Sequence, residues 1–292
     1  LGGTTVKIGL FTVDGMLQEK WEIPTRTENQ GAAILSDIAA SIQNKVDVRH
    51  LTKEQVTGIG IGVPGPVLNE NRVQGCVNLG WGNVCVADEL SALTGMKVKA
   101  ANDANVAALG EQWQGGGKGY RNIVMFTLGT GVGGGIIQNG QIVSGANGAA
   151  GEIGHMRLEK NGRRCYCGNY GCFDAYCNTL ILKDAAGGEL KDFFAGIDQG
   201  NREYERILDE YVERLSDAVF NIRMLYDDTV LIGGELGEYA DYFIEKVWGI
   251  LDSQDIYREE SAKDYVKVCE DGENVIAIGA AMYYINQAAV RL

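Results

Sequence analysis

The chain carries one short pattern twice. The first copy is Leu1-Gly-Gly-Thr-Thr-Val-Lys-Ile-Gly-Leu-Phe-Thr-Val-Asp-Gly-Met-Leu17, and the second is Leu128-Gly-Thr-Gly-Val-Gly-Gly-Gly-Ile-Ile-Gln-Asn-Gly-Gln-Ile-Val143. Each copy reads as a Gly-rich turn, a strand, an Asp-Gly or Asn-Gly turn and a second strand, because these dipeptides favour hairpin turns. The copies lie too far apart for a solenoid repeat. The pattern therefore predicts a β-hairpin at the head of each of two related domains, with a cleft between them.

Helices and strands alternate around these hairpins, which predicts an α/β protein. Apolar residues recur at helical spacing over 31–46, 86–93, 103–114, 201–226, 238–251 and 275–290. Buried strands are expected at 56–63, 97–101, 123–128 and 229–232. A Gly-rich stretch near residue 114 is the most linker-like part of the chain. We expect an N-terminal α/β domain over 1–113, with a C-terminal helix at 276–292 that packs back on it, and a C-terminal α/β domain over 114–275.

Composition excludes several classes of protein. The chain has 292 residues, of which 45% are hydrophobic and 22% charged, and these values are typical of a folded globular protein. The 26 basic residues against 39 acidic residues leave a net charge of −13, which opposes binding to nucleic acid or to an anionic membrane. No apolar run approaches the ~20 residues of a membrane span, and no signal peptide opens the sequence. We therefore expect a cytoplasmic protein.

Glycine-rich loops suggest a phosphate ligand. Two segments match the dinucleotide pattern G-x-G-x-x-G, at Gly60/Gly62/Gly65 and Gly129/Gly131/Gly134. Neither opens a helix, as that fingerprint requires, since the first runs into Pro64 and Pro66 and the second into a hairpin. A Walker A loop is also absent, because Lys118 is followed by glycine. What remains is a pair of Gly/Thr-rich turns, whose backbone N–H groups and hydroxyls suit a polyphosphate. Ordinary tight hairpins are the alternative, which two copies in register disfavour.

An Asn-Asp pair marks a strand-to-helix junction. Asn102 and Asp103 follow a predicted strand and precede a predicted helix. Open α/β sheets build their ligand sites at the carboxyl ends of strands, so Asp103 is a candidate catalytic carboxylate. Asn and Asp are also favoured as helix N-caps, so a purely structural role stays open at this point.

A cluster of cysteines predicts a metal site. The loop 155–172 contains four candidate ligands: His155, Cys165, Cys167 and Cys172. The three cysteines have the spacing C-x-C-G-x-x-G-C. Three thiolates and one imidazole match a closed tetrahedral zinc site, and the glycines allow the chain to wrap tightly. Free buried thiols would not explain this spacing. Cys177 would be a fifth ligand and is left out.

Taken together, these motifs resemble the ROK family (repressors, open reading frames, kinases) of the actin-like sugar-kinase superfamily, and its bacterial glucokinase members above all. The segments that carry the resemblance follow the family order along nearly the whole chain; they are Leu1–Thr4, Gly62–Gly65, Asn78–Trp81, Asn102-Asp103, Gly129–Gly135, Glu152–His155, Cys165–Cys172 and Ile232–Gly234. The resemblance implies two related actin-like, ribonuclease-H-like domains that flank a cleft. It also implies a homodimer.

The resemblance assigns roles to single residues. Nucleotide phosphates would be bound by Gly2, Gly3, Thr4, Thr5, Thr130, Gly131, Val132 and Gly133, and adenosine by Gly233 and Gly234. The sugar would be bound by Gly65, Asn78, Asn102, Asp103, Glu152, His155 and Asp174. Asp103 would be the general base. His155 would ligate zinc through one ring nitrogen while the other faces the sugar, so that the metal organises the sugar site.

The expected activity is transfer of the γ-phosphoryl group of Mg-ATP to the 6-hydroxyl of a hexose, and glucose is the expected sugar. Two departures from the family pattern bear on it. The family motif D-x-G-G-T has an Asp that would stand immediately before Leu1, and the family has Glu, a ligand of the sugar hydroxyls, where this chain has Asp174. Kinases of N-acetylmannosamine, fructose or allose, and a non-catalytic sugar-binding or repressor module, remain the alternatives.

Overall fold

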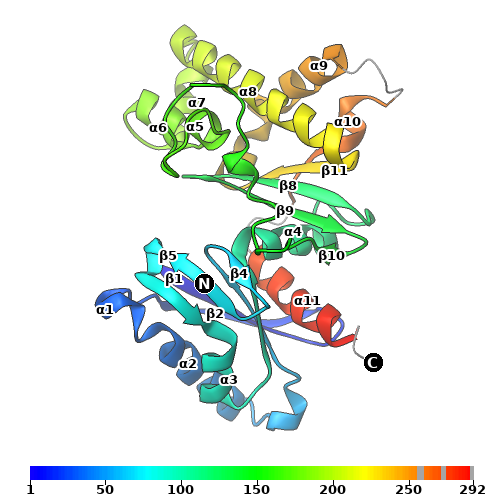
Figure 1. Cartoon of the computed structure of the whole chain (residues 1–292). Coiled ribbons are helices and arrows are strands. Elements are labelled where there is room, and N and C mark those ends of the chain that lie inside the picture. The colour runs from blue at the N-terminus through cyan, green and yellow to red at the C-terminus, as the bar shows by residue number, and fades with distance from the viewer. Residues whose placement is uncertain (255–259, 271–273, 290–292) are drawn as a thin grey trace. The chain divides into compact units, whose positions relative to one another are not determined.

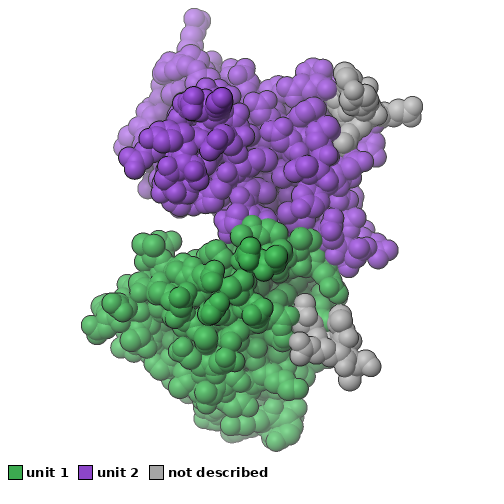
Figure 2. Space-filling model, viewed as in Figure 1, with its two compact units in different colours: residues 1–114, 140–150, 273–292 green, residues 115–139, 151–272 purple. Residues whose placement is uncertain are grey.

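The computed structural model describes residues 1–254, 260–270 and 274–289. The chain divides into two compact units (Figure 2): unit 1 comprises Leu1–Gln114, Gly140–Ala150 and Glu273–Leu292, and unit 2 comprises Gly115–Asn139 and Gly151–Gly272. Both units mix helices with sheets (Figure 1), so the predicted α/β class is confirmed. Residues 140–150 return to unit 1, and the sequence had no signal for this excursion.

Unit 1 contains most of the short strands. Its strands are β1 (Thr5–Phe11), β2 (Leu17–Pro24), β3 (Ile59–Val63), β4 (Val67–Leu68), β5 (Arg72–Cys76), β6 (Trp81–Cys85), β7 (Val98–Asn102) and β10 (Gln141–Ile142). Its helices are α1 (Glu28–Gly31), α2 (Ile34–Val48), η1 (Lys53–Gln55), η2 (Val77–Leu79), α3 (Val86–Thr94), α4 (Asp103–Gln114) and α11 (Val275–Ala289). β1 pairs antiparallel with β2, β3 pairs parallel with β7, and β4, β5 and β6 form an antiparallel sheet.

The helices α4 and α11 of unit 1 pack closely, because two glycines let their backbones approach. A Cβ atom at Gly279 would meet the carbonyl oxygen of Val106, and one at Gly110 would meet that of Val275. α11 also contacts β3 and β7. The helix α11 therefore packs against elements of unit 1 (Figure 1).

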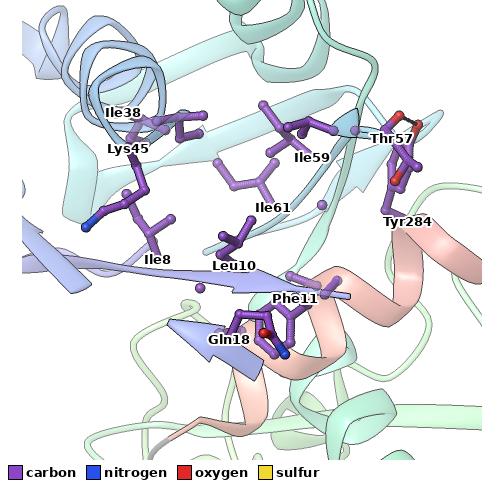
Figure 3. A pocket seen from close by; sticks show the side chains of 18 of the residues that line it. Ile8, Leu10, Phe11, Gln18, Ile38, Lys45, Thr57, Ile59, Ile61 and Tyr284 are labelled. Carbon is purple, nitrogen blue, oxygen red and sulfur yellow. Dashed lines mark hydrogen bonds between the residues drawn. The ribbon is translucent and has the colours of Figure 1, made fainter. Parts of the chain in front are cut away.

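An apolar cavity of about 450 Å³ lies inside unit 1, between β1 and β3. Residues 6–13 and 55–62 line it without a break, whereas only alternate residues would do so if a sheet face bordered the cavity. The edges of the two strands therefore face it. Figure 3 shows Ile8 and Leu10 of β1 with Ile59 and Ile61 of β3 around this space, and Tyr284 donating a hydrogen bond to the carbonyl oxygen of Thr57.

Unit 2 is built on a more continuous sheet. Its strands β8 (Ile123–Leu128), β9 (Val132–Gln138), β11 (Thr229–Gly233) and β12 (Val266–Val268) lie in the order β9-β8-β11-β12. β8 pairs antiparallel with β9 and parallel with β11. The helices of unit 2 are η3 (Ile153–His155), α5 (Asp174–Cys177), α6 (Leu180–Ala186), α7 (Leu190–Asp198), α8 (Arg202–Tyr226), η4 (Glu235–Tyr242), α9 (Ile244–Gln254) and α10 (Ala262–Tyr265).

One predicted helix is wrong and another is confirmed. The segment 238–251 is not continuous, because η4 ends at Tyr242 and α9 begins at Ile244, with the buried Phe243 at the break. The apolar spacing continues across the break, so periodicity alone could not locate it. By contrast, α8 begins where expected, since the Asn201 side chain accepts hydrogen bonds from the backbone N–H groups of Glu203 and Tyr204.

Over the described parts of the chain, every helix is too short or too polar to pass through a lipid bilayer.

Candidate functional site

The Asn-Asp pair of unit 1 lies at the junction of β7 and α4. The Asn102 side-chain oxygen accepts from the Asn105 N–H at 3.1 Å, so Asn102 is the residue that caps α4. Its amide also donates to the Gly65 carbonyl oxygen at 3.1 Å, which ties the loop after β3 to the end of β7. Asp103 accepts from the adjacent Ala104 N–H at 2.9 Å and is half-buried. Capping is thus supplied by Asn102, and the N-cap alternative does not account for Asp103.

The first Gly/Thr turn, in unit 1, is held by hydrogen bonds of its own backbone and of Thr25. The Gly2 N–H donates to the Thr5 carbonyl oxygen at 3.0 Å, and the Thr25 hydroxyl donates to the Gly2 carbonyl oxygen at 2.7 Å. Gly3 lies beside Asn78, since a Cβ atom at Gly3 would be 3.6 Å from the Asn78 carbonyl oxygen. A residue predicted for phosphate and one predicted for sugar therefore meet in unit 1.

One polar residue of this region had no sequence signal. Asn105 is only 5% exposed, and its side-chain oxygen has no hydrogen-bond partner among the described residues. It lines a polar cavity of about 250 Å³ together with Asn102 and the loop residues Gly145 and Gly148. Buried carbonyl oxygens are normally hydrogen-bonded, so this cavity suits a water molecule or another hydrogen-bond donor. The helical spacing of α4 predicts which positions are buried, but it does not distinguish Asn105 from the other buried positions.

The second Gly/Thr turn and the Gly-Gly turn lie at one edge of the unit 2 sheet. β8 and β11 are parallel neighbours, so the turns that follow them, at Gly129–Gly133 and at Gly233-Gly234, leave the sheet at the same edge. Gly234 has a positive φ of 81°, and a Cβ atom there would lie 2.6 Å from the Leu128 backbone nitrogen. Only glycine fits this approach. The predicted phosphate and adenosine segments of unit 2 are thus adjacent, at the carboxyl ends of parallel strands.

Asp174 has partners that the sequence did not indicate. It is 3% exposed, and its Oδ1 accepts from the Val132 N–H at 2.6 Å. Its Oδ2 lies 3.9 Å from the Cys165 Sγ atom. The Asp174 carboxylate, predicted to read sugar hydroxyls, is therefore engaged by the backbone of the phosphate turn. The Val132 N–H, predicted to bind nucleotide, is the donor of that hydrogen bond.

The predicted metal ligands come together in unit 2. One ligand atom from each of His155, Cys165, Cys167 and Cys172 lies within 4.8 Å of the others. The Cys167 and Cys172 sulfurs are 3.8 Å apart, and the Cys165 sulfur is 3.9 Å from Nδ1 of His155. A tetrahedral zinc ion with Zn–S bonds of about 2.3 Å separates two sulfurs by about 3.8 Å, so the residues fit this ion. Cys177 lies apart, with its sulfur against the Tyr211 carbonyl oxygen.

Backbone turns hold this cluster. Gly168 and Gly171 have φ values of 90° and 77°, which favour glycine, and the Gly168 N–H donates to the Cys165 carbonyl oxygen at 3.0 Å. Burial raises the pKa of the Cys165 thiol to about 12, whereas the Asn169 N–H lowers the pKa of the exposed Cys167 thiol. A bound cation supplies the positive charge that a buried thiolate needs.

The remaining two predicted sugar ligands lie at η3, where Glu152 precedes the helix and His155 is its last residue. Glu152 is exposed, and its carbonyl oxygen accepts from the His155 N–H at 3.1 Å. Nε2 of His155 lies 3.4 Å from the Tyr166 hydroxyl, and the two rings meet edge to face. Because Nδ1 faces the cysteines, Nε2 is the nitrogen that remains for a second partner. Tyr166 therefore borders the position predicted for sugar, and no motif had singled it out.

The predicted sugar ligands divide between the units. Unit 1 holds Gly65, Asn78, Asn102 and Asp103, and unit 2 holds Glu152, His155 and Asp174.

Comparisons with known proteins agree with these motifs. A glucokinase of Halalkalibacterium halodurans is 34% identical over 85% of this chain and 82% of its own length, and a glucokinase of Thermotoga maritima is 36% identical over 82% of each. The crystal structure of a ROK family glucokinase from Streptomyces griseus, in complex with glucose and AMPPNP, superposes with a TM-score of 0.76 over 97% of this chain and 96% of that one, at 24% identity. The family model described as "ROK family" matches residues 1–287, so this chain belongs to the ROK family.

Proposed function

We propose that this protein is an ATP-dependent glucokinase, which transfers the γ-phosphoryl group of ATP to the 6-hydroxyl of glucose. The observation that carries the proposal is 34% and 36% identity to two curated glucokinases over most of their lengths and of this chain. The motifs that carry the resemblance follow the family order, with departures before Leu1 and at Asp174. The neighbour from Streptomyces griseus, which contains glucose and AMPPNP, supports the same pair of substrates.

In this proposal Asp103 is the general base. Its place at the carboxyl end of β7 and the capping of α4 by Asn102 support this role, because Asp103 is then not needed as the cap. Asp103 would accept the proton of the 6-hydroxyl as that oxygen attacks the γ-phosphorus, while ADP leaves with the bridging oxygen. Positioning and electrostatic stabilisation supply most of the rate in phosphoryl transfer.

The nucleotide would be bound by the two Gly/Thr turns and the Gly-Gly turn. The adjacency of Gly129–Gly133 and Gly233-Gly234 in unit 2 supports this assignment for phosphates and adenosine. In unit 1 the turn at Gly2–Thr5, which the hydrogen bond from the Gly2 N–H to the Thr5 carbonyl oxygen closes, would form the rest of the phosphate site. Mg²⁺, bound with ATP, would neutralise charge on the phosphate oxygens.

Glucose would be bound by Gly65, Asn78, Asn102, Glu152 and His155. The four-residue cluster around His155 supports a structural Zn²⁺ that fixes the ring through Nδ1 and leaves Nε2 for a hydroxyl group. Three further expectations accompany this function: a homodimer, a cytoplasmic location in sugar metabolism, and no nucleic-acid partner, which the net charge of −13 supports.

A hexose panel tests the proposal. Purified protein with Mg-ATP is assayed for ADP release in the presence of glucose, mannose, N-acetylmannosamine, N-acetylglucosamine, fructose or allose. We expect the highest kcat/KM with glucose. A higher value with a 2-acetamido sugar or a ketose would identify a kinase of another hexose, and sugar binding without ADP release would indicate a non-catalytic sugar-binding module.

A further inference from the structure

The turn at residues 129–133 of unit 2, here called the phosphate turn, joins β8 to β9 and does not open a helix. It is tied down from outside by two hydrogen bonds: the Val132 N–H donates to Oδ1 of Asp174 at 2.6 Å, and the Thr179 N–H donates to the Gly129 carbonyl oxygen at 2.7 Å. Both donor-acceptor pairs join the turn to the segment around α5. One bond lies at each end of the turn, so together they fix its shape.

Asp174 makes the stronger of the two connections. It is 3% exposed, and a buried carboxylate is stable only where charge-assisted hydrogen bonds replace its water. The fit is tight as well, since a Cβ atom at Gly131 would lie 3.3 Å from the same Oδ1. A carboxylate one methylene longer would have to displace the turn or rotate away from it.

Thr179 extends the connection to the second nucleotide segment. It is fully buried, and its hydroxyl donates to Oε2 of Glu235 at 3.0 Å. Glu235 directly follows the Gly-Gly turn and pairs with Lys183 at 2.6 Å. The segment 174–183 thus contacts the phosphate turn and Glu235, the residue that follows the Gly-Gly turn.

We propose that Asp174 is a positioning residue for the nucleotide, which holds the phosphate turn through Val132, and that it does not read the sugar. The inference rests on the proposed function. Backbone N–H groups bind phosphate well only if they are already oriented, because ordering them on binding costs affinity. Loss of the Asp174 carboxylate should therefore weaken nucleotide binding more than sugar binding, because its contact with the metal cluster, Oδ2 to the Cys165 sulfur, is long at 3.9 Å.

The test compares Asp174→Ala with Asp174→Asn. The alanine variant removes the acceptor, and we expect its KM for ATP and its Kd for AMPPNP to rise by about tenfold or more, with KM for glucose unchanged within about twofold. The asparagine variant keeps an oxygen that can accept from Val132, so we expect it to stay within about threefold of wild type. Ser216→Ala, which removes an equally buried hydroxyl bonded to the Val212 carbonyl oxygen within α8, is the matched control and should change neither constant.

The outcomes separate this inference from the proposed function. A rise in KM for glucose with unchanged AMPPNP affinity in Asp174→Ala would overturn the inference and assign Asp174 to the sugar. Equal AMPPNP affinity in wild type and Asp174→Ala would also overturn it, whatever hexose is used. Wild-type protein that binds AMPPNP but phosphorylates no hexose would refute the proposed function alone, because the Kd for AMPPNP is measured without sugar. If Asp174→Ala fails to fold, the test passes to Asp174→Glu, which should raise the Kd for AMPPNP through the tight contact at Gly131.

Discussion

The two copies of the hairpin pattern are embedded differently in their units. In unit 2 the strand that precedes the phosphate turn is β8, and it pairs with β9 on one side and β11 on the other. In unit 1, β1 pairs only with β2, and β3 only with β7, among the described residues. An apolar cavity of about 450 Å³ lies between β1 and β3.

This difference shows that a sequence repeat specifies a turn but not its support. In unit 1 the turn is held by Thr25, whose hydroxyl and N–H bond the carbonyl oxygens of Gly2 and Thr4. In unit 2 the equivalent turn is held by Asp174 and Thr179, which lie far along the chain. The apolar cavity of unit 1 is lined by sheet edges and core helices, and none of the predicted catalytic or sugar-binding residues is among its lining residues.

The largest effect should come from Asp103, the proposed general base, which lies in unit 1. Asp103→Asn should lower kcat by ~10²–10⁴, the usual contribution of a positioned acid-base group, with glucose affinity kept within about tenfold. Steady-state kinetics with both substrates measure this. A variant with near-normal kcat would remove Asp103 from the mechanism.

The next largest effect should come from the metal cluster, which unit 1 lacks among its described residues. We expect one Zn²⁺ per chain, and Cys167→Ser should lose the metal and most of the glucose affinity, because the ring of His155 is then no longer oriented. Metal analysis of the purified protein and calorimetry with glucose measure both. Cys85→Ser, which alters a thiol outside the cluster, is the control. Active enzyme that contains no zinc would show that the cluster is a group of free thiols and not a metal site.

Backbone protection should differ between the two sheets. We expect backbone amides of β8, which has a partner strand on each side, to exchange at least about tenfold more slowly than those of β1 and β3, whose edges face the cavity. Hydrogen exchange with fragment-level mass spectrometry compares the three strands in one sample. Equal protection would show that the cavity between β1 and β3 is closed in solution.

The smallest effect should come from Thr25 in unit 1. Thr25→Val removes one exposed hydrogen bond to Gly2 but leaves the backbone bond to Thr4, so KM for ATP should rise by only about twofold, within the ordinary range for one hydrogen bond. The rise in KM for ATP in Asp174→Ala, in unit 2, should be clearly larger. The same steady-state assay compares the two variants. An effect of Thr25→Val as large as that of Asp174→Ala would mean that both turns depend equally on side-chain support.

Local patterns predicted the local structure well. The helix at 103–114 and the strand at 123–128 have the predicted bounds, and Asn139 and Gly140 both have the positive φ of a tight hairpin turn. The cysteine spacing predicted a cluster because its glycines must turn there. The hydrogen bond between Asp174 and Val132 joins residues that are distant in sequence. The helix breaks at Phe243, although the apolar spacing of the sequence continues through this residue. Neither has a local signal, because both depend on tertiary packing.

The sugar oxygen that receives the γ-phosphoryl group defines the reaction, and labelled ATP locates that oxygen. The protein is incubated with ATP labelled at the γ-phosphorus and with either glucose or 6-deoxyglucose, and the products are separated and identified by NMR. We expect labelled glucose 6-phosphate from glucose and no labelled sugar from 6-deoxyglucose, which lacks the accepting oxygen. Label on 6-deoxyglucose, or on a glucose oxygen other than O6, would show that the protein is not a glucose 6-kinase.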